Sequence, residues 1–460
     1  MVADLAIYTV VHQPRRLKLP AQPIPRGASA EDIAHCLFDE QMNERYFRKV
    51  AKYCYYPATR MFLDLVRQGL RFSIGFSLSF VRQAQMWDPD LLDLFRELVA
   101  EDNVELIGVE PYHSFLFLLD LPAFVQRMRE MVDELEDVFG KRPVVTDTTE
   151  MCMSASLYHA LDAAGFQGAL LDGRPWVMGW RETSHLYRYG GEIAAPLLTQ
   201  KPVTRSRRVV RDAAQESSPY LLARHLDLSD DVGYRFSNRS WAGFPLYAPN
   251  YADWIADTWG DLALLGWDYE TFGEHHRLDS GIFEFMRSLP RELERRNVTT
   301  YTASELIARH QENTYDLPLP VFPTTWAGSG GMEFFLGNSA QQAILQLMGH
   351  IYGVARLTEN PEMMDLALWL AQSDNLHLIQ WFGRSGPEAE VSAYFTPQEW
   401  WALGANGVIH EQQQVYMNAL HAMESYLPTR LRRQAGLKKP RSRARSQAPV
   451  AELAAVASSA

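Results

Sequence analysis

The sequence predicts a mostly parallel α/β barrel followed by a C-terminal helical domain. Short β-type runs alternate with helical stretches over the first two thirds of the 460 residues, and strands separated by helices indicate a parallel sheet. Seven or eight such units within about 310 residues favour a barrel over an open sheet. After Gln311 the strand pattern ends and helical periodicity takes over, which indicates a second structural unit.

Each expected strand is a short run of aliphatic, β-branched or aromatic residues. The expected strands are Leu5–Val11, Phe72–Phe76, Val104–Gly108, Val144–Thr146, Ala169–Leu171, Val232–Phe236, Leu262–Gly266 and Thr299–Tyr301. The clearest of the intervening helices is Pro122–Phe139, where apolar residues recur at steps of three and four before Gly140 ends the run.

The chain beyond residue 311 begins with a segment rich in Pro, Gly and Thr, Asp316–Gly331, which is typical of a linker or an active-site loop. Helices are expected at Ala340–Leu357, Pro361–Gln372 and Pro397–Tyr426. We expect a barrel over 1–312, a helical domain over 313–428 that completes the cleft, and a basic, disordered tail over 429–460. Residues 200–218 are interpreted as a surface insertion.

Composition and charge argue against several classes of protein. The net charge is −12, and the basic stretch Arg430–Arg445 follows an acidic body, so no nucleic-acid partner is expected. No apolar run of about 18 residues and no signal peptide is recognised, so no membrane partner is expected. Three cysteines without CxxC spacing predict neither a disulfide framework nor a zinc site. A reducing cytoplasm fits best, and the oligomeric state stays open.

Ionisable and polar side chains follow four of the expected strands. The residues concerned are His12 and Gln13, then Glu110 and His113, then Glu150, and finally Asp268–His276. The carboxyl ends of parallel barrel strands meet at one rim, where chemistry is placed. Carboxyl groups and imidazoles are costly to desolvate there but useful for proton transfer. We therefore expect one active site at this rim.

Four motifs occur at these strand ends. They are His12-Gln13-Pro14, the stretch Val104–Ser114, the pair Thr149-Glu150, and the segment Asp268–His275 with the sequence Asp-Tyr-Glu-Thr-Phe-Gly-Glu-His. Together they resemble glycoside hydrolase family 57, in particular its α-amylase-like branch, over roughly Ala3–Tyr426. The eight-residue motif is highly specific, whereas His-Gln-Pro alone would be weak.

The resemblance implies an incomplete seven-stranded (β/α)7 barrel that hydrolyses α-1,4-glucans or maltooligosaccharides with retention of anomeric configuration. It implies that Glu150 is the nucleophile and Asp268 the general acid/base, about 5–5.5 Å apart as retention requires. Neither a metal nor another cofactor is expected. The residues expected to contact sugar hydroxyls or orient the pair are His12, Gln13, Glu110, His113, Glu270 and His275. Candidate stacking platforms are Trp241, Trp267 and Trp326, although core packing is the favoured interpretation for Trp267.

Two segments depart from the pattern of this branch. Asp147-Thr148 precede Thr149-Glu150 where the branch usually has Arg-Asn. An acid three residues from the nucleophile could raise its pKa or alter the sugar-binding subsite. The loop Thr324–Ser329 also differs from the expected Ser-Trp-Ala-Asp type.

Three alternatives stay open at this point. A 4-α-glucanotransferase differs from a hydrolase only in whether a sugar or water meets the glycosyl ester. A metal-dependent deacetylase or mannosidase on a related barrel would use zinc ligands drawn from His12, His113, Asp268, Glu274 and His275. A glucan-binding homologue without catalysis would bind glycogen without turnover.

Overall fold

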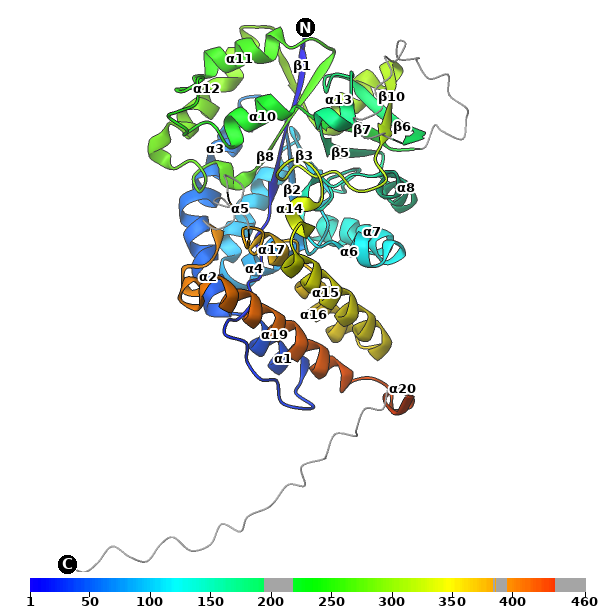
Figure 1. Cartoon of the computed structure of the whole chain (residues 1–460). Coiled ribbons are helices and arrows are strands. Elements are labelled where there is room, and N and C mark those ends of the chain that lie inside the picture. The colour runs from blue at the N-terminus through cyan, green and yellow to red at the C-terminus, as the bar shows by residue number, and fades with distance from the viewer. Residues whose placement is uncertain (194–217, 384, 386–394, 435–460) are drawn as a thin grey trace, which may run out of the picture.

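The computed structural model describes residues 1–193, 218–383, 385 and 395–434. Its central feature is a barrel of seven parallel strands, with β1 at the centre of the view in Figure 1. The strands of the barrel are β1 (Asp4–Val11), β2 (Phe72–Phe76), β3 (Val104–Ile107), β4 (Val145–Thr146), β5 (Gly168–Asp172), β7 (Tyr220–Arg224) and β8 (Leu262–Asp268). Paired neighbours run in the order β4-β5-β7-β8-β1-β2-β3.

Two pairs of neighbouring strands in the barrel are joined by only one residue pair each. β7 and β8 share one registered residue pair, Arg224 with Leu264, whereas β1 and β8 are paired from Asp4 to Val10. β3 and β4 meet through one parallel bridge between Gly108 and Thr146. The predicted incomplete (β/α)7 barrel is therefore confirmed, and the carboxyl ends of its strands converge on one rim.

Most of the expected strands lie where the sequence placed them, but one is wrong. Residues predicted as the strand Val232–Phe236 include the end of helix α10 (Leu226–Gly233), and the strand at this place in the order is β7, which precedes the helix. Residues 232–236 alternate between apolar and other residues, which is the pattern of a half-buried strand, so the sequence favoured them. β7 is a continuous apolar run, as is typical of a strand buried on both faces, and it shows no such alternation.

Three further strands lie outside the barrel. β9 (Thr299–Tyr301) has the bounds predicted from the sequence, and it pairs with the start of β1. β6 (Leu186–Ile193) and β10 (Thr314–Leu319) pair with each other in parallel, and β6 also pairs with β7. The sequence did not predict β6 or β10, and residues Asp316–Leu319 of β10 belong to the segment interpreted as a linker or an active-site loop.

Helices surround the barrel on its outside (Figure 1). They are α2 (Glu40–Val50), α3 (Tyr56–Arg67), α4 (Leu78–Trp87), α5 (Pro89–Ala100), α6 (Leu116–Leu119), α7 (Leu121–Phe139), α8 (Ala155–Ala164), α9 (Pro175–Met178), α11 (Ala248–Asp257), α12 (Ile282–Glu294) and α13 (Ala303–His310). α7 shows how local sequence sets the bounds. The Asp120 side chain accepts a hydrogen bond from the first turn, and Gly140 ends the helix in a left-handed conformation at φ 74°.

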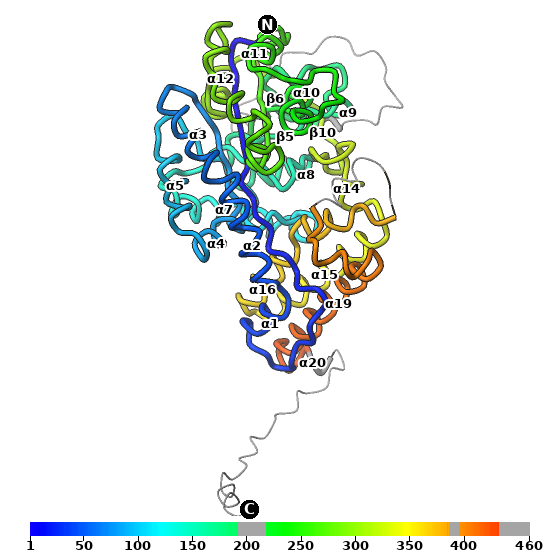
Figure 2. Tube along the Cα trace, turned by 90° about the vertical axis from the view of Figure 1, so that its left-hand side faces the viewer, coloured from blue at the N-terminus to red at the C-terminus, as the bar shows by residue number. Residues whose placement is uncertain are grey.

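The C-terminal helices extend from the barrel to the bottom of the folded chain in Figures 1 and 2. They are α14 (Glu333–Leu336), α15 (Ser339–Thr358), α16 (Pro361–Leu370), α17 (Asp374–His377), α19 (Gly404–Glu424) and α20 (Thr429–Gln434). The early helix α1 (Ala30–Leu37) packs against α16 and α19, so the N-terminal segment contributes to this end as well.

The division into 1–312 and 313–428 stays a prediction, since β10 joins the sheet and α1 joins the helical end. Residues 429–434 of the predicted tail form α20, and its remainder lies outside the described residues. The predicted insertion lies outside them as well, except for Ser218. In the described part of the chain, no helix is long and apolar enough to cross a membrane.

Candidate active site

A cavity of about 750 Å³ opens at the carboxyl ends of the barrel strands, a size ordinary for a small-molecule site. From the barrel it is lined by His12, Gln13, His113, Glu150, Asp268, Glu270 and His275. From the loop after β10 and the C-terminal helices it is lined by Trp326, Phe334, Asp374, His377, Leu378, Phe395 and Trp401, among others. The cavity therefore lies between the barrel rim and the helical end.

Eight of the eleven site residues expected from sequence line this one cavity. The three that do not are Glu110, Trp241 and Trp267. Trp267 is buried and its indole N–H donates to the Ser229 carbonyl at 2.8 Å, which fits the core role favoured for it. Trp241 packs edge-on against Trp254, with ring centroids 6.2 Å apart.

Glu110 holds the turn that carries His113. Its fully buried carboxyl group accepts hydrogen bonds from the backbone N–H groups of Tyr112 and Ser114, at 3.0 and 2.5 Å, and from the Ser114 hydroxyl at 3.0 Å. Burial raises the pKa of Glu110 to about 7, against the effect of these donors. Glu110 thus positions His113 from behind rather than facing the cavity.

Glu150 lies in a short turn, Thr149–Met151, after β4 and has a left-handed backbone conformation, at φ 58° and ψ 32°. Such a conformation costs of order 1–3 kcal/mol for a residue other than glycine. The loop after β10 holds it in place, because the backbone N–H of Trp326 and the hydroxyl of Thr325 both donate to the Glu150 carbonyl, at 3.1 and 2.8 Å. The strained backbone directs the Glu150 side chain to the cavity wall.

Both carboxyl oxygens of Glu150 receive a hydrogen bond. The Trp326 indole N–H donates to Oε2 at 2.8 Å, and the Ser373 hydroxyl donates to Oε1 at 3.2 Å. Burial raises the pKa of Glu150 to about 8; the Trp326 hydrogen bond opposes this, and the charges of Asp374 and Asp268 add to it. The predicted influence of Asp147 is not among these causes.

Asp268 ends β8 on the wall of the same cavity. Burial raises its pKa to about 6, and the nearby Arg224 and His12 limit the rise. Arg224 is buried, and its guanidinium donates to Asp172 at 2.8 Å, to Asp230 at 2.6 Å and to the Gly266 carbonyl at 2.8 Å. Among the described residues, no side chain donates a hydrogen bond to the Asp268 carboxyl group. The carboxyl groups of Glu150 and Asp268 thus have different surroundings.

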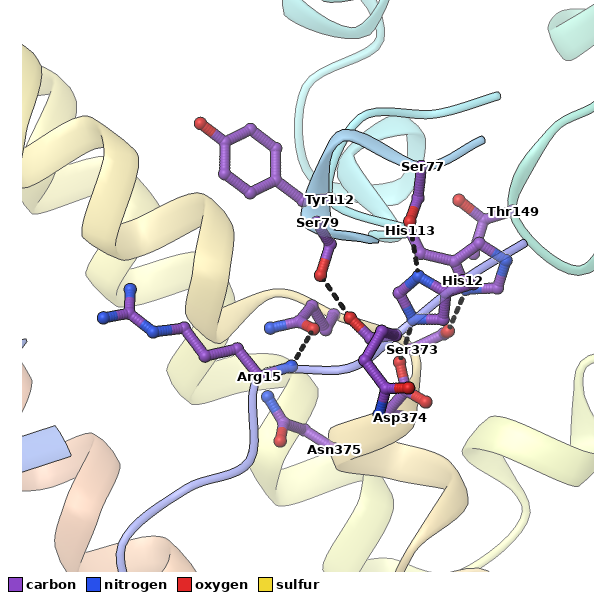
Figure 3. Close-up of polar contacts among 12 residues, drawn as sticks. His12, Arg15, Ser77, Ser79, Tyr112, His113, Thr149, Ser373, Asp374 and Asn375 are labelled. Atoms are coloured by element: carbon purple, nitrogen blue, oxygen red, sulfur yellow. Dashed lines mark hydrogen bonds and ion pairs between the residues drawn. The ribbon is translucent and has the colours of Figure 1, made fainter. Parts of the chain in front are cut away.

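His12 links the first strand to the C-terminal helices (Figure 3). Its Nδ1 lies 2.8 Å from the Ser77 hydroxyl and its Nε2 lies 2.9 Å from Asp374 Oδ2. The His12 ring stacks on that of His113 at a centroid distance of 4.2 Å, and His113 Nδ1 lies 3.0 Å from the Ser373 hydroxyl. Residues 373 and 374 therefore complete the site from the far end of the sequence.

This network sets the charges of its members. Burial alone would raise the pKa of Asp374, but the charge and hydrogen bond of His12 hold it below its ordinary value. Burial and the proximity of His12 lower the pKa of His113 to about 3. At neutral pH, Asp374 is therefore ionised and His113 is neutral, so His113 can both donate and accept a hydrogen bond.

Of the five predicted zinc ligands, His12 and His113 belong to a possible metal-binding group, and its third member is Asp374, which was not predicted. His12, His113 and Asp374 place one ligand atom each within 4.8 Å of one another, a donor set that suits zinc. Glu274, by contrast, is ion-paired with Lys49. The contacts of His12 and His113 with Ser77, Ser373 and Asp374 account for the arrangement without a metal.

Glu270 and His275 form the wall on the side of β8. The Tyr55 hydroxyl donates to Glu270 at 2.6 Å and lies 3.0 Å from the Gln13 side-chain oxygen. Burial and the charge of Asp268 raise the pKa of Glu270 to about 8, while burial lowers the pKa of His275 to about 4. Both side chains are thus neutral at pH 7. His276 is buried and lies 2.8 Å from the Ser237 hydroxyl.

Gly273 determines how closely this motif packs on the barrel helices. Its φ is 119°, and a Cβ here would lie 2.0 Å from the Tyr53 carbonyl oxygen. Gly273→Ala is therefore expected to lower the free energy of unfolding by about 2–4 kcal/mol in denaturant titrations. Gly69→Ala is the matched control, because Gly69 also has a positive φ, 108°, but faces open space. Equal losses for both variants would contradict the predicted clash.

The sequence model described as "Glycosyl hydrolase family 57" matches residues 6–319 of this chain. A protein of Methanocaldococcus jannaschii described as "Putative alpha-amylase" is 29% identical over 435 residues, which cover 91% of this chain and 83% of that protein.

Two solved structures with a similar fold cover nearly all of the chain. A 4-alpha-glucanotransferase from Thermococcus litoralis superimposes with a TM-score of 0.58 at 14% identity, over 92% of this chain and 60% of the other. A GH57-type branching enzyme from Pyrococcus horikoshii superimposes with a TM-score of 0.57 at 15% identity, over 93% of this chain and 97% of the other. The chain thus spans less than two thirds of the glucanotransferase, and at these identities the likeness shows the fold alone.

Proposed function

The chain belongs to glycosyl hydrolase family 57, and we propose that it is a retaining hydrolase of α-1,4-glucans that acts through a glycosyl-enzyme intermediate. The observation that carries the proposal is that Glu150, which follows β4, and Asp268, which ends β8, line one cavity although they are 118 positions apart. Two carboxyl groups in a shared cleft are what glycoside hydrolysis requires. The substrate would be an α-glucan or a maltooligosaccharide, and a cytoplasmic location stays a prediction.

In the first step, an oxygen of ionised Glu150 would attack the anomeric carbon. The bond from that carbon to the leaving oxygen breaks, and the leaving oxygen takes the proton of Asp268. In the second step, Asp268 takes a proton from water, the water oxygen attacks the anomeric carbon, and the ester to Glu150 breaks. Each carboxyl group is thereby returned to its starting state.

The protonation states of the free protein differ from those of the reacting complex. With pKa values of about 8 for Glu150 and about 6 for Asp268, the pair holds one proton at pH 7, and that proton favours Glu150. A glycosidic oxygen against Asp268 can accept a hydrogen bond only from the protonated acid, so bound substrate favours moving the proton to Asp268. The donors Trp326 and Ser373 would then stabilise the Glu150 anion.

The remaining wall would bind sugar hydroxyls. Neutral His113, His275 and Glu270 can each donate and accept hydrogen bonds, as a hydroxyl requires. Ionised Asp374 lies at the same wall, with its Oδ2 2.9 Å from Nε2 of the His12 imidazole. Trp326, held against Glu150, would present its ring to the sugar at the reacting centre.

Product analysis tests the proposal. The protein is incubated with maltotriose, maltoheptaose and glycogen, and the products are separated by chromatography. We expect products shorter than the substrate, new reducing ends, and an initial product of the α configuration. When maltotriose is the only substrate, products longer than maltotriose would instead show a 4-α-glucanotransferase, in which a sugar hydroxyl replaces water. Binding to glycogen without any turnover would contradict the proposal and favour a non-catalytic homologue.

A further inference from the structure

Trp401 presents an exposed aromatic face to the cavity. It is 47% exposed and lines the cavity wall, while the adjacent Trp400 is 1% exposed and anchors the segment in the core. The Trp401 ring stacks on the ring of Trp381 with centroids 5.3 Å apart and an angle of 29° between the planes. An exposed indole ring that lines a cavity and rests on a second, half-buried ring indicates a binding surface rather than core packing.

The two rings are held before any ligand arrives. The Trp381 indole N–H donates to the Leu378 carbonyl at 3.0 Å and to the Thr396 hydroxyl at 3.2 Å. On the other side, Glu399 is ion-paired with Arg45 of α2, which ties the Trp401 segment to the barrel side of the cavity. A ligand that stacks on Trp401 therefore needs little reordering of the protein, which favours affinity.

Trp401 and Trp326 serve different parts of the cavity. Trp326 is bonded directly to Glu150, so its ring belongs to the reacting centre. Trp401 is supported by Trp381 and lies in the short helical segment Gln398–Leu403, between α17 and α19. One continuous cavity joins the two rings, as an extended chain of sugars would need.

We propose that Trp401, backed by Trp381, is a stacking platform for a glucose unit remote from the cleaved bond, and that it gives the protein a preference for longer α-glucans. This rests on the proposed function for the nature of the ligand. Aromatic rings are large apolar surfaces with low entropy cost on binding, and the apolar face of a glucose ring matches them. We therefore expect a short oligosaccharide that fills the reacting centre to leave the platform unoccupied.

The test compares substrates of two lengths. In Trp401→Ala, kcat/KM for maltoheptaose is expected to fall about tenfold through KM, while that for maltotriose stays within about twofold. Trp401→Phe keeps an aromatic face and should restore most of the loss. Trp259→Ala is the control, because Trp259 is 68% exposed but does not line the cavity. Equal losses for the two substrates, or no loss for either, would overturn the proposal.

A binding measurement separates this inference from the proposed function. Calorimetric titration of Glu150→Gln with maltoheptaose measures binding without turnover. Adding Trp401→Ala to this variant should raise the dissociation constant about tenfold. If the protein turns over no glucan but this weakening is seen, the hydrolase proposal fails and the platform stands. If turnover is seen and the affinity for maltoheptaose is unchanged by Trp401→Ala, the platform fails alone.

Discussion

Glu150→Gln is expected to lower kcat for maltooligosaccharides by at least about a thousandfold without changing the fold. An amide cannot attack the anomeric carbon to form an ester that water then hydrolyses. The amide oxygen can still accept the Trp326 indole hydrogen bond, and glutamine occupies the same volume at the same backbone conformation. Release of reducing sugar measures the loss, and circular dichroism with thermal unfolding checks the fold.

Glu294→Gln is the matched control for this variant. Glu294 ends α12 on the exposed surface and does not line the cavity, so the same chemical change there should leave kcat within about twofold. A Glu150→Gln protein that is folded and retains a tenth or more of the activity would show that Glu150 is not the nucleophile.

Asp268→Ala is expected to slow the hydrolysis of maltooligosaccharides by about 10²–10⁴-fold, because their leaving alcohol needs a proton. For an α-glycosyl fluoride or an aryl glycoside with a good leaving group, the first step needs no acid, so the loss there should be far smaller. Added azide should restore the second step by attacking the ester without a base, with release of a glycosyl azide. Equal losses on both kinds of substrate would argue against an acid role for Asp268.

The pH dependence follows from the same pair. The reaction needs one ionised and one protonated carboxyl group, so kcat/KM in the wild type should fall below about pH 6, where both are protonated, and above about pH 8, where both are ionised. Asp268→Ala removes the acid and also a charge that raises the pKa of Glu150. With an activated substrate, its profile should therefore lose the alkaline fall and keep an acidic limb shifted below pH 8. An alkaline fall that persists would assign that limb to another group.

The barrel could be predicted because its strands are short apolar runs separated by amphipathic helices, a pattern that depends only on local sequence. The strand ends at His12, His113, Glu150 and Asp268 could be predicted to meet because parallel barrel strands share one rim. β6 and β10 were missed because their pairing joins segments more than a hundred residues apart, and neither run alternates strongly.

Asp374 and Ser373 could not be found in this way. They lie at the start of α17, in the helical end, where no strand pattern marks the rim. Only the packing of these helices over the barrel places Asp374 against His12 and Ser373 against Glu150. Trp401 was not predicted either, because a Trp-Trp pair in sequence indicates core packing, and only the structure shows that one of the two rings is exposed.

Asp147 shows a different limit of sequence reasoning. Its carboxyl group is buried and accepts a hydrogen bond from the Tyr8 hydroxyl at 2.8 Å. Burial raises its own pKa to about 8, with a smaller contribution from Asp268. The acid three residues before Glu150 is therefore a neutral neighbour of the site at pH 7, whereas the charges that raise the pKa of Glu150 are those of Asp268 and Asp374.

Trapping of the covalent intermediate tests the two-carboxylate account most directly. A 5-fluoro-α-glucosyl or maltosyl fluoride forms the glycosyl-enzyme ester and hydrolyses slowly, because the ring fluorine destabilises the oxocarbenium-like transition states. Digestion and mass spectrometry then locate the sugar. The expected result is one adduct on the peptide that carries Glu150, lost in Glu150→Gln. An adduct on Asp268 would reverse the two roles, and turnover with inverted configuration and no adduct would contradict the account altogether.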